Sequence, residues 1–190
     1  MSSGTAHRPG IPTLTTERLV LRPFVAGDLD ELAVVHAEES FWWYPLRAAM
    51  SKEDTHLFLE RTLARYESDG FGIEAVIDRS NGAMLGWAGL AVPHFLPEIL
   101  PAVEVGWRLS RAYWGRGLAT EAGAAAVDFG FTTGGLDRIV SIYEPENEAS
   151  GRVMGRLGFT RCLSTTGQRG EEIVVTELRR AQWEAQRSGG

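Results

Sequence analysis

The sequence predicts an α/β fold, in which helices and strands share one hydrophobic core. Three observations lead to this prediction. The chain has 190 residues, of which 44% are hydrophobic, and this length suits one domain and argues against two. Strand-like segments alternate with segments whose apolar residues repeat at helical spacing. Near the middle of the chain, residues 104–121 read as a strand, a tight glycine turn and the start of a helix.

The composition excludes several classes of protein. A formal net charge of −6 argues against a nucleic-acid-binding surface, which usually carries a basic stripe. The single cysteine, Cys162, cannot form an internal disulfide or a cysteine-based zinc site, and we expect it to be buried or to line a strand. No apolar run approaches the roughly 18 residues that span a bilayer, and residues 1–14 lack the apolar core of a signal peptide. We therefore expect a cytoplasmic protein with a flexible leader at 1–14, without a membrane partner, a nucleic-acid partner or a metal.

The first third of the chain predicts one strand and two helices. Residues 18–24 alternate in the manner of a strand that ends at a proline. Residues 28–36 form a helical pattern, because their apolar side chains repeat at i, i+3, i+4 and i+7. His36 ends that apolar stripe, so we expect a packed histidine and not a ligand. A second helix is expected over residues 51–67, between a serine cap and an Asp-Gly stop.

An aromatic segment, Phe41-Trp-Trp-Tyr-Pro45, separates these two helices and has two interpretations. It forms either a hydrophobic plug beneath a loop or one wall of a substrate pocket, since pockets are rich in aromatic side chains. A second apolar loop, residues 94–101, contains prolines that exclude regular structure. If both loops flank the same cleft, the side chains that would contact the substrate are Trp42, Trp43, Tyr44 and Phe95.

The remaining two thirds of the chain predict six strands and two helices. The dipeptide Asn81-Gly82 between two strand-like segments is a strong hairpin signal. One helix begins near Leu118, and a shorter one begins at Asn147. We expect strands at 71–77, 84–92, 103–109, 138–143, 159–165 and 173–178. The prediction is one domain over residues 15–180, with about seven strands and about four helices, followed by a frayed, flexible tail at 181–190.

The glycine turn at Gly115 and Gly117 has the features of an anion site. Glycine lets the backbone approach a ligand closely, and the N–H groups and dipole at the start of a helix favour negative charge. A phosphate ester is the natural ligand for such a turn. Alone, a two-glycine turn is also found in many loops that bind nothing, so other parts of the chain must decide its meaning.

Four pieces of the sequence, in order, resemble the GNAT superfamily of N-acetyltransferases, in particular its Rim-type branch of ribosomal-protein N-terminal acetyltransferases. They are Thr16-Glu-Arg-Leu-Val-Leu-Arg-Pro23, Glu104-Val-Gly-Trp-Arg-Leu109, Tyr113-Trp-Gly-Arg-Gly-Leu-Ala-Thr-Glu-Ala122, and Asn147-Glu-Ala-Ser150 with Leu157-Gly-Phe159. Together they cover roughly residues 16–178. The resemblance implies a mixed, mostly antiparallel sheet whose central parallel pair of strands splays apart, with acetyl-coenzyme A (acetyl-CoA) in the notch.

The resemblance also implies how this cosubstrate would be held. Backbone N–H groups of the turn would bind its diphosphate, namely those of Gly115, Arg116, Gly117, Leu118, Ala119 and Thr120. The backbone of Trp107, Arg108 and Leu109 would pair with the pantetheine arm as a further strand would. Asn147 would meet the pantetheine from the other side of the notch. The Arg116 side chain either contacts a phosphate or remains a solvated surface charge.

Two positions depart from the superfamily pattern. Trp114 stands where the superfamily has Arg or Gln, although an aromatic residue is common there in the Rim-type branch. Met154 replaces a tyrosine that protonates the departing thiolate in many members, and a thioether cannot donate a proton. Ser150 is the expected substitute, because it lies three residues after Asn147 on the same helical face. The alternative role of Ser150 is to satisfy backbone groups in the first helical turn.

Glu104 is the best candidate for a general base. An ammonium group has no lone pair at pH 7, so it must lose a proton before it attacks the thioester carbonyl. The apolar neighbours Val103 and Val105 would raise the pKa of the Glu104 carboxyl toward neutrality. The alternative is a strand carboxylate that is paired with an arginine. Backbone N–H groups of Val105 or Gly106 would stabilise the developing oxyanion.

These inferences predict an acetyl-CoA-dependent N-acetyltransferase that transfers an acetyl group directly to a primary amine, with a protein or peptide N-terminal α-amine favoured. An amino acid, a polyamine or an aminoglycoside is the alternative acceptor, and a non-catalytic acyl-CoA sensor is the alternative function. A Rossmann or P-loop protein is excluded, because neither GxGxxG after the first strand nor GxxxxGK(S/T) is present. The enzyme would be a monomer or a homodimer.

Overall fold

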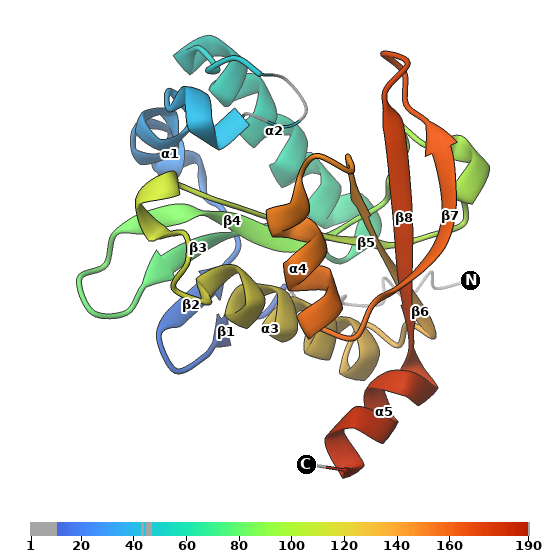
Figure 1. Ribbon diagram of the computed structural model, residues 1–190. Coiled ribbons are helices and arrows are strands. Elements are labelled where there is room, and N and C mark those ends of the chain that lie inside the picture. Colours follow the sequence, from blue (N-terminus) through green and yellow to red (C-terminus); the bar gives the residue numbers. More distant parts are fainter. Residues whose placement is uncertain (1–10, 43, 45–46, 190) are drawn as a thin grey trace, which may run out of the picture.

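The computed structural model describes residues 11–42, 44 and 47–189 as one mixed sheet with helices on both faces (Figure 1). The strands in chain order are β1 (Leu14–Thr15), β2 (Leu19–Arg22), β3 (Ile73–Asp78), β4 (Met84–Ala91), β5 (Glu104–Leu109), β6 (Arg138–Tyr143), β7 (Thr160–Thr166) and β8 (Glu172–Arg179). The α-helices are α1 (Leu29–His36), α2 (Lys52–Asp69), α3 (Leu118–Thr132), α4 (Glu148–Arg156) and α5 (Arg180–Ser188).

The strand order is β1-β2-β3-β4-β5-β6-β8-β7, and every neighbouring pair is antiparallel except β5 and β6. This confirms the predicted mixed, mostly antiparallel sheet with one parallel pair near its centre. The described residues contain one strand and one helix more than predicted. The additional strand is β1, a two-residue extension that pairs with β2 at the sheet edge.

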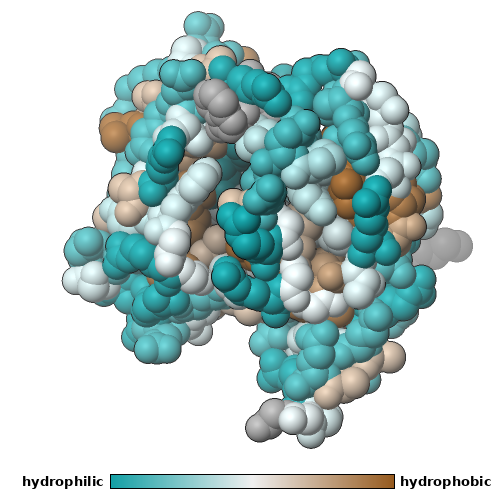
Figure 2. Space-filling view, viewed as in Figure 1, coloured by the Kyte–Doolittle hydropathy of each residue, from teal (hydrophilic) through white to brown (hydrophobic). Residues whose placement is uncertain are grey.

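The two faces of the sheet carry different helices. Leu32 of α1 and Leu59 of α2 pack with Ala75 and Met84 on one face. On the other face, Leu118 and Ala122 of α3 pack with side chains of β2, β3, β4 and β5. Because successive side chains along a strand point to opposite faces of the sheet, each face has its own layer of apolar side chains. The face of the molecule that carries α4 is mainly hydrophilic, with hydrophobic residues in separate spots (Figure 2).

Local signals explain where the α2 helix and the β3–β4 hairpin begin and end. The Ser51 side chain accepts a hydrogen bond from the Asp54 N–H, and Gly70 closes α2 with a left-handed φ of 76°. In the hairpin, Gly82 has the same left-handed φ, and its N–H donates to the Asp78 carbonyl at 2.8 Å. His36 is fully buried against Phe41 and Trp42, as the predicted packed histidine, and its burial lowers its pKa to about 4.

Three features differ from the expectations. Residues 181–188 belong to helix α5 and are not frayed, because the Trp183 indole donates to Asp128 at 2.8 Å and its ring packs on Phe131. Cys162 lies on β7 as expected but is exposed, since β7 is the edge strand of the sheet. The loop at 94–101 contains a short 3₁₀ turn, Pro97–Ile99, whose Ile99 is buried.

Candidate active site

The parallel strands β5 and β6 separate almost as soon as they meet. Their register contains a single pair, Glu104 with Val140, and the Val140 N–H donates to the Val103 carbonyl at 2.9 Å. One residue further on, the Val105 carbonyl accepts the Ser141 hydroxyl at 2.9 Å, so a side chain takes the place of a backbone donor. The strands diverge beyond this point, which is the splay that the resemblance implies.

A cavity of about 760 Å³ occupies the splay, between β5, β6, the first turn of α3, and α4. Most of the residues predicted for the site line it. They are Glu104, Trp107, Arg108, Leu109, Gly115, Gly117, Leu118, Ala119, Thr120, Asn147, Ser150, Tyr44 and Phe95. Trp42 does not line the cavity, Arg116 is also absent from its described lining, and Trp43 lies outside the described residues.

The β5 backbone offers one edge to β4 and the other to the cavity. The Ser110 N–H donates to the carbonyl of Leu85, which lies opposite it in the register. Because the donor direction alternates along a strand, the N–H groups of Gly106 and Arg108 also face β4. The Val105 N–H lies on the other edge of β5, within the parallel Glu104–Val140 bridge to β6, and those of Trp107 and Leu109, beyond the bridge, face the cavity. Gly106 is therefore not a suitable oxyanion donor, and Trp107 fits that role in its place.

The first turn of α3 has the geometry of an anion site. Its N-cap, Gly117, has a left-handed φ of 78° and no capping side chain. The first intrahelical bond runs from the Glu121 N–H to the Gly117 carbonyl at 3.0 Å, so the three preceding N–H groups have no acceptor within the helix. The Thr120 hydroxyl is buried and has no partner among the described residues. A group rich in acceptor oxygens, such as a diphosphate, fits these donors.

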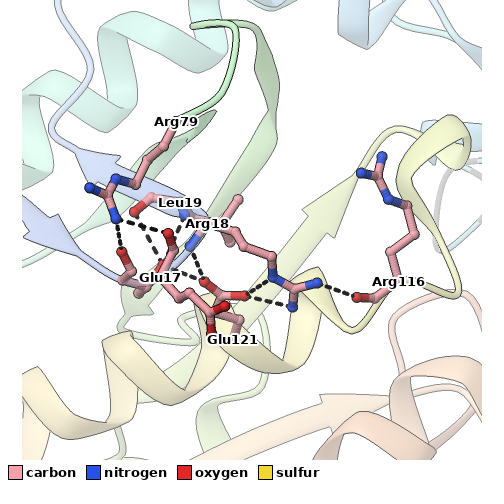
Figure 3. Close-up of polar contacts among 7 residues, drawn as sticks. Glu17, Arg18, Leu19, Arg79, Arg116 and Glu121 are labelled. Atoms are coloured by element: carbon pink, nitrogen blue, oxygen red, sulfur yellow. Dashed lines mark hydrogen bonds and ion pairs between the residues drawn. The ribbon is translucent and has the colours of Figure 1, made fainter.

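The Arg116 side chain favours the surface alternative. Arg116 is exposed, and its guanidinium lies 5.8 Å from the centre of the Tyr113 ring. Figure 3 shows this side chain extending away from the start of α3. The Arg116 backbone carbonyl, in contrast, accepts a hydrogen bond from Arg18 at 2.8 Å.

Glu104 is a half-buried carboxyl in the cavity wall at the base of the splay. Burial raises the pKa of Glu104 to about 8, and the positive charge of Arg108 offsets part of that rise. Among the residues that the structure describes, Glu104 has no ion pair within 4.0 Å. The geometry thus favours the predicted base over the alternative of an arginine-paired carboxylate.

Arg108 has a role that its position in the sequence did not indicate. Its guanidinium donates to the carbonyls of Phe41, at 2.7 Å, and of Tyr44, and lies 4.6 Å from the centre of the Trp42 ring. The side chain therefore fastens the aromatic segment to the strand that carries Glu104. The segment divides between the core and the cavity, because Trp42 is 6% exposed in the core whereas Tyr44 faces the cavity, and contact of Tyr44 with a substrate stays a prediction.

The α4 helix presents its first turn to the cavity. Asn147 is its N-cap, and the Asn147 side chain accepts the Ser150 N–H at 3.2 Å. This bond uses the Ser150 backbone, so the Ser150 hydroxyl is available on the cavity wall. Met154 is 2% exposed, and its sulfur lies 3.4 Å from the Thr176 hydroxyl that donates to it.

The sequence predictions missed Tyr143, Glu144 and Arg169, which also line the cavity. The Tyr143 ring packs on the first turn of α4, 3.1 Å from where a Cβ on Gly151 would lie. Glu144 is 6% exposed and pairs with Arg169 at 2.6 Å and with Arg47 at 3.6 Å. Tyr143 and Glu144 end a buried strand next to a splay, and that position is a signal that could have identified them.

Two further findings concern ligands. The described residues contain no cluster of three or more His, Cys, Asp or Glu side chains arranged to hold a metal ion. Within residues 11–42, 44 and 47–189, no helix is both long enough and apolar enough to cross a membrane.

Comparisons with known proteins agree with this geometry. A family model described as an acetyltransferase (GNAT) domain matches residues 18–160. The [Ribosomal protein uS5]-alanine N-acetyltransferase of Escherichia coli is 28% identical across a match that covers 93% of this chain and 96% of that protein. An acetyltransferase structure from Agrobacterium tumefaciens is 29% identical with a TM-score of 0.74, covering 89% of this chain and 95% of that one.

A structure described as a GNAT-family acetyltransferase from Bordetella pertussis is similar to the same extent. It is 26% identical with a TM-score of 0.76, covering 87% of this chain and 98% of that one. The family model spans most of the chain. The residues that it matches include the splayed β5–β6 pair and the glycine turn at the start of α3. The chain therefore belongs to the GNAT acetyltransferase family and is an N-acetyltransferase, an enzyme class that uses acetyl-CoA as its acetyl donor.

Proposed function

We propose that this enzyme transfers the acetyl group of acetyl-CoA to the N-terminal α-amine of a protein or peptide. The observation that supports acetyl transfer most directly is the placement of the unpaired Glu104 carboxyl at the base of the β5–β6 splay, in one cavity with the α3 anion turn. The acceptor class rests on the relative from Escherichia coli, whose name specifies a ribosomal-protein alanine and whose length this chain matches almost completely.

The residues present fit acetyl-CoA. The free N–H groups of Leu118, Ala119 and Thr120 would hold its diphosphate, with the unpartnered Thr120 hydroxyl as a further donor. The cavity-facing backbone of Trp107 and Leu109 would pair with the amide groups of the pantetheine arm. Asn147 would contact the same arm from α4. When bound, the cosubstrate supplies a thioester carbonyl beside Glu104.

The chemistry then needs three actions from the protein. Glu104 accepts a proton from the acceptor ammonium, directly or through a water, so that the amine can attack the thioester carbonyl. The Trp107 N–H lies on the cavity-facing edge of β5 and is placed to stabilise the oxyanion. The C–N bond forms, the C–S bond breaks, and the thiolate takes a proton from a donor on the opposite wall.

Two hydroxyl groups on that wall can supply this proton, and we expect Ser150 to be the main donor. In that case Ser150→Ala lowers kcat roughly tenfold or more, in the range of general acid catalysis, while the KM for acetyl-CoA changes little. Tyr143→Phe, which removes the phenol at the end of β6, should have a smaller effect. Steady-state kinetics of both variants measure the difference. A full effect in Tyr143→Phe with none in Ser150→Ala would assign the role to the phenol.

The acceptor side of the cavity suits a cation. The carboxyls of Glu104, Glu144 and Glu171 line it, and only Glu104 among them is without an arginine partner in the described chain. Tyr44 and Phe95 contribute aromatic walls from two loops, and Gln168 donates to the Phe95 carbonyl at 3.2 Å. An ammonium directed at Glu104, with a side chain between the aromatic walls, matches this arrangement.

A thiol-release assay across acceptor classes tests the proposal. We expect rapid release of CoA with peptides whose α-amine is free, and none with the same peptides after N-terminal blocking, even when they retain a lysine. Free amino acids, polyamines and aminoglycosides should be much poorer acceptors. Turnover confined to these small amines would contradict the peptide assignment. Binding of CoA without turnover for any amine would instead indicate the sensor.

A further inference from the structure

Arg18, the residue immediately before β2, contacts the glycine turn from the side away from the cavity. Arg18 is not among the residues that line the cavity. The Arg18 guanidinium donates from Nε to Glu121 Oε2 at 2.6 Å and from Nη1 to the Arg116 carbonyl at 2.8 Å. Its second terminal nitrogen lies 2.6 Å from the same Glu121 oxygen. Figure 3 shows Arg18 between the carboxylate of α3 and the backbone of the turn. One side chain therefore connects the two halves of the anion site.

The bond to the Arg116 carbonyl determines where the next N–H points. The carbonyl of Arg116 and the N–H of Gly117 belong to the same planar trans peptide, so they point in opposite directions. Arg18 draws the carbonyl toward the outer side of the turn. The Gly117 N–H is consequently directed toward the cavity side, where a diphosphate would accept it.

The hydrogen bonds to Glu121 compensate its negative charge at the start of α3. Glu121 lies in the first turn of α3, and although burial alone would raise its pKa, hydrogen bonds from Thr16 and Arg18 lower it. The carboxylate is thus charged, and it accepts the Thr16 hydroxyl at 2.6 Å and the Arg18 N–H at 2.8 Å. A free negative charge at this point would repel a diphosphate at the same helix start. The Arg18 guanidinium neutralises it.

Stability alone does not account for this arrangement. The Arg18 side chain is 47% exposed and that of Glu121 is 16% exposed, so solvent reaches the pair from the Arg18 side and weakens its contribution to the free energy of folding. The β2 strand is anchored independently by its four register pairs with β3. A network that solvent weakens, and that lies directly behind the glycine turn, is better explained by the shape of that turn.

We propose that Arg18 is a positioning residue for acetyl-CoA, which aims the Gly117 N–H at the diphosphate and neutralises Glu121. This inference rests on the proposed function of the α3 turn as the diphosphate site. It predicts that Arg18 acts on the nucleotide half of the cosubstrate alone. The pantetheine arm and the reacting carbonyl would lie along β5, to which Arg18 makes none of its hydrogen bonds.

The test compares acetyl-CoA with S-acetylpantetheine, which lacks the diphosphate. In Arg18→Ala, the KM for acetyl-CoA should rise about tenfold, the loss expected for a charge-assisted hydrogen bond, with kcat retained. The kcat/KM for S-acetylpantetheine should stay within about twofold of the wild-type value. An equal loss for both donors, or no loss for either, would overturn the inference.

Two further variants separate the parts of the proposal. Arg18→Ala combined with Glu121→Gln removes the unpaired carboxylate and should recover part of the loss in affinity for acetyl-CoA. No recovery would contradict the neutralising role. Arg138→Ala is the matched control, because Arg138 pairs with Glu177 at 2.8 Å with similar exposure and lies away from the turn. We expect its KM to equal that of the wild type.

The outcome also separates this inference from the proposed diphosphate site. If Gly117→Asp weakens CoA binding and Arg18→Ala does not, the site stands and only the positioning role fails. If neither variant affects CoA binding, the diphosphate does not bind at the turn and both proposals fail.

Discussion

Replacing Glu104 by glutamine should lower turnover at neutral pH by at least about tenfold while leaving the affinity for acetyl-CoA nearly unchanged. Glutamine keeps the size and polarity of the side chain but cannot accept a proton from the acceptor ammonium. The proposed diphosphate donors lie at the start of α3, a different element of the cavity wall from the strand that carries Glu104, so cosubstrate binding should be spared. Single-turnover kinetics together with a direct binding measurement for CoA distinguish the two effects.

The pH dependence of the activity tests the same role of Glu104. The base works only when it is deprotonated, and burial raises the pKa of Glu104 to about 8. The ratio of wild-type to Glu104→Gln activity should therefore be small at acidic pH and should increase as pH rises toward 8. Taking this ratio with one acceptor cancels the titration of the acceptor amine. A ratio that does not change with pH would remove Glu104 as the base.

The same pKa affects stability. A carboxyl whose pKa is higher in the folded than in the unfolded protein favours folding below its unfolded pKa, and this contribution is lost as pH rises through the folded value. The wild type should therefore lose stability relative to Glu104→Gln between about pH 5 and above pH 8. Thermal unfolding of both proteins across that range measures the difference. Glu98→Gln, which removes an exposed charge that does not line the cavity, should follow the wild type.

The sequence was sufficient for the parts of the fold that local patterns determine. The β3–β4 hairpin, the caps of α2 and the strand–turn–helix around Gly117 follow from signals within a few residues of each other. The parallel, splayed pair at β5 and β6 came from the resemblance. The polar tail was misread because its helix depends on Trp183, a single aromatic residue whose partner, Asp128, lies 55 positions earlier.

The candidate site shows the same division. The residues of the cavity walls could be predicted, because each belongs to a motif of its own element. The functions of Arg108 and Arg18 could not, since their partners are 67 and 103 positions away and no periodicity connects them. The direction of the Gly106 N–H likewise depends on which β5 residues pair with β4. Such contacts are fixed by the assembled sheet and leave no local pattern.

The second large effect is expected at Gly117, where aspartate should weaken CoA binding at least about tenfold. Two like charges a few ångströms apart at a protein surface repel by about 1–4 kcal/mol, and about 1.4 kcal/mol corresponds to tenfold in affinity. The left-handed φ of 78° strains any side chain at this position, but aspartate and asparagine are among the non-glycine residues that adopt such a φ most often, so both variants carry a similar backbone cost. The nearest atom to an added Cβ is Arg18 Nη2 at 3.6 Å, so space is available, and the Arg18 guanidinium would offset part of the added negative charge.

Gly117→Asn separates charge from shape. Asparagine has nearly the same size as aspartate and also tolerates a left-handed backbone, so it should weaken CoA binding much less. Calorimetric titration with CoA at low and at high salt measures both variants, and the aspartate effect should shrink as salt screens the repulsion. Gly135→Asp, at the other end of α3 with a left-handed φ of 65° and open space around it, should bind CoA as the wild type does.

Equal losses in the aspartate and asparagine variants would mean that close backbone approach, and not charge, makes Gly117 necessary. Unchanged binding in Gly117→Asp would place the diphosphate elsewhere in the cavity. In that case the unpartnered Thr120 hydroxyl and the three free N–H groups of α3 would need another acceptor, and the arginines on the cavity wall at α4, Arg152 and Arg156, would be the next donors to test.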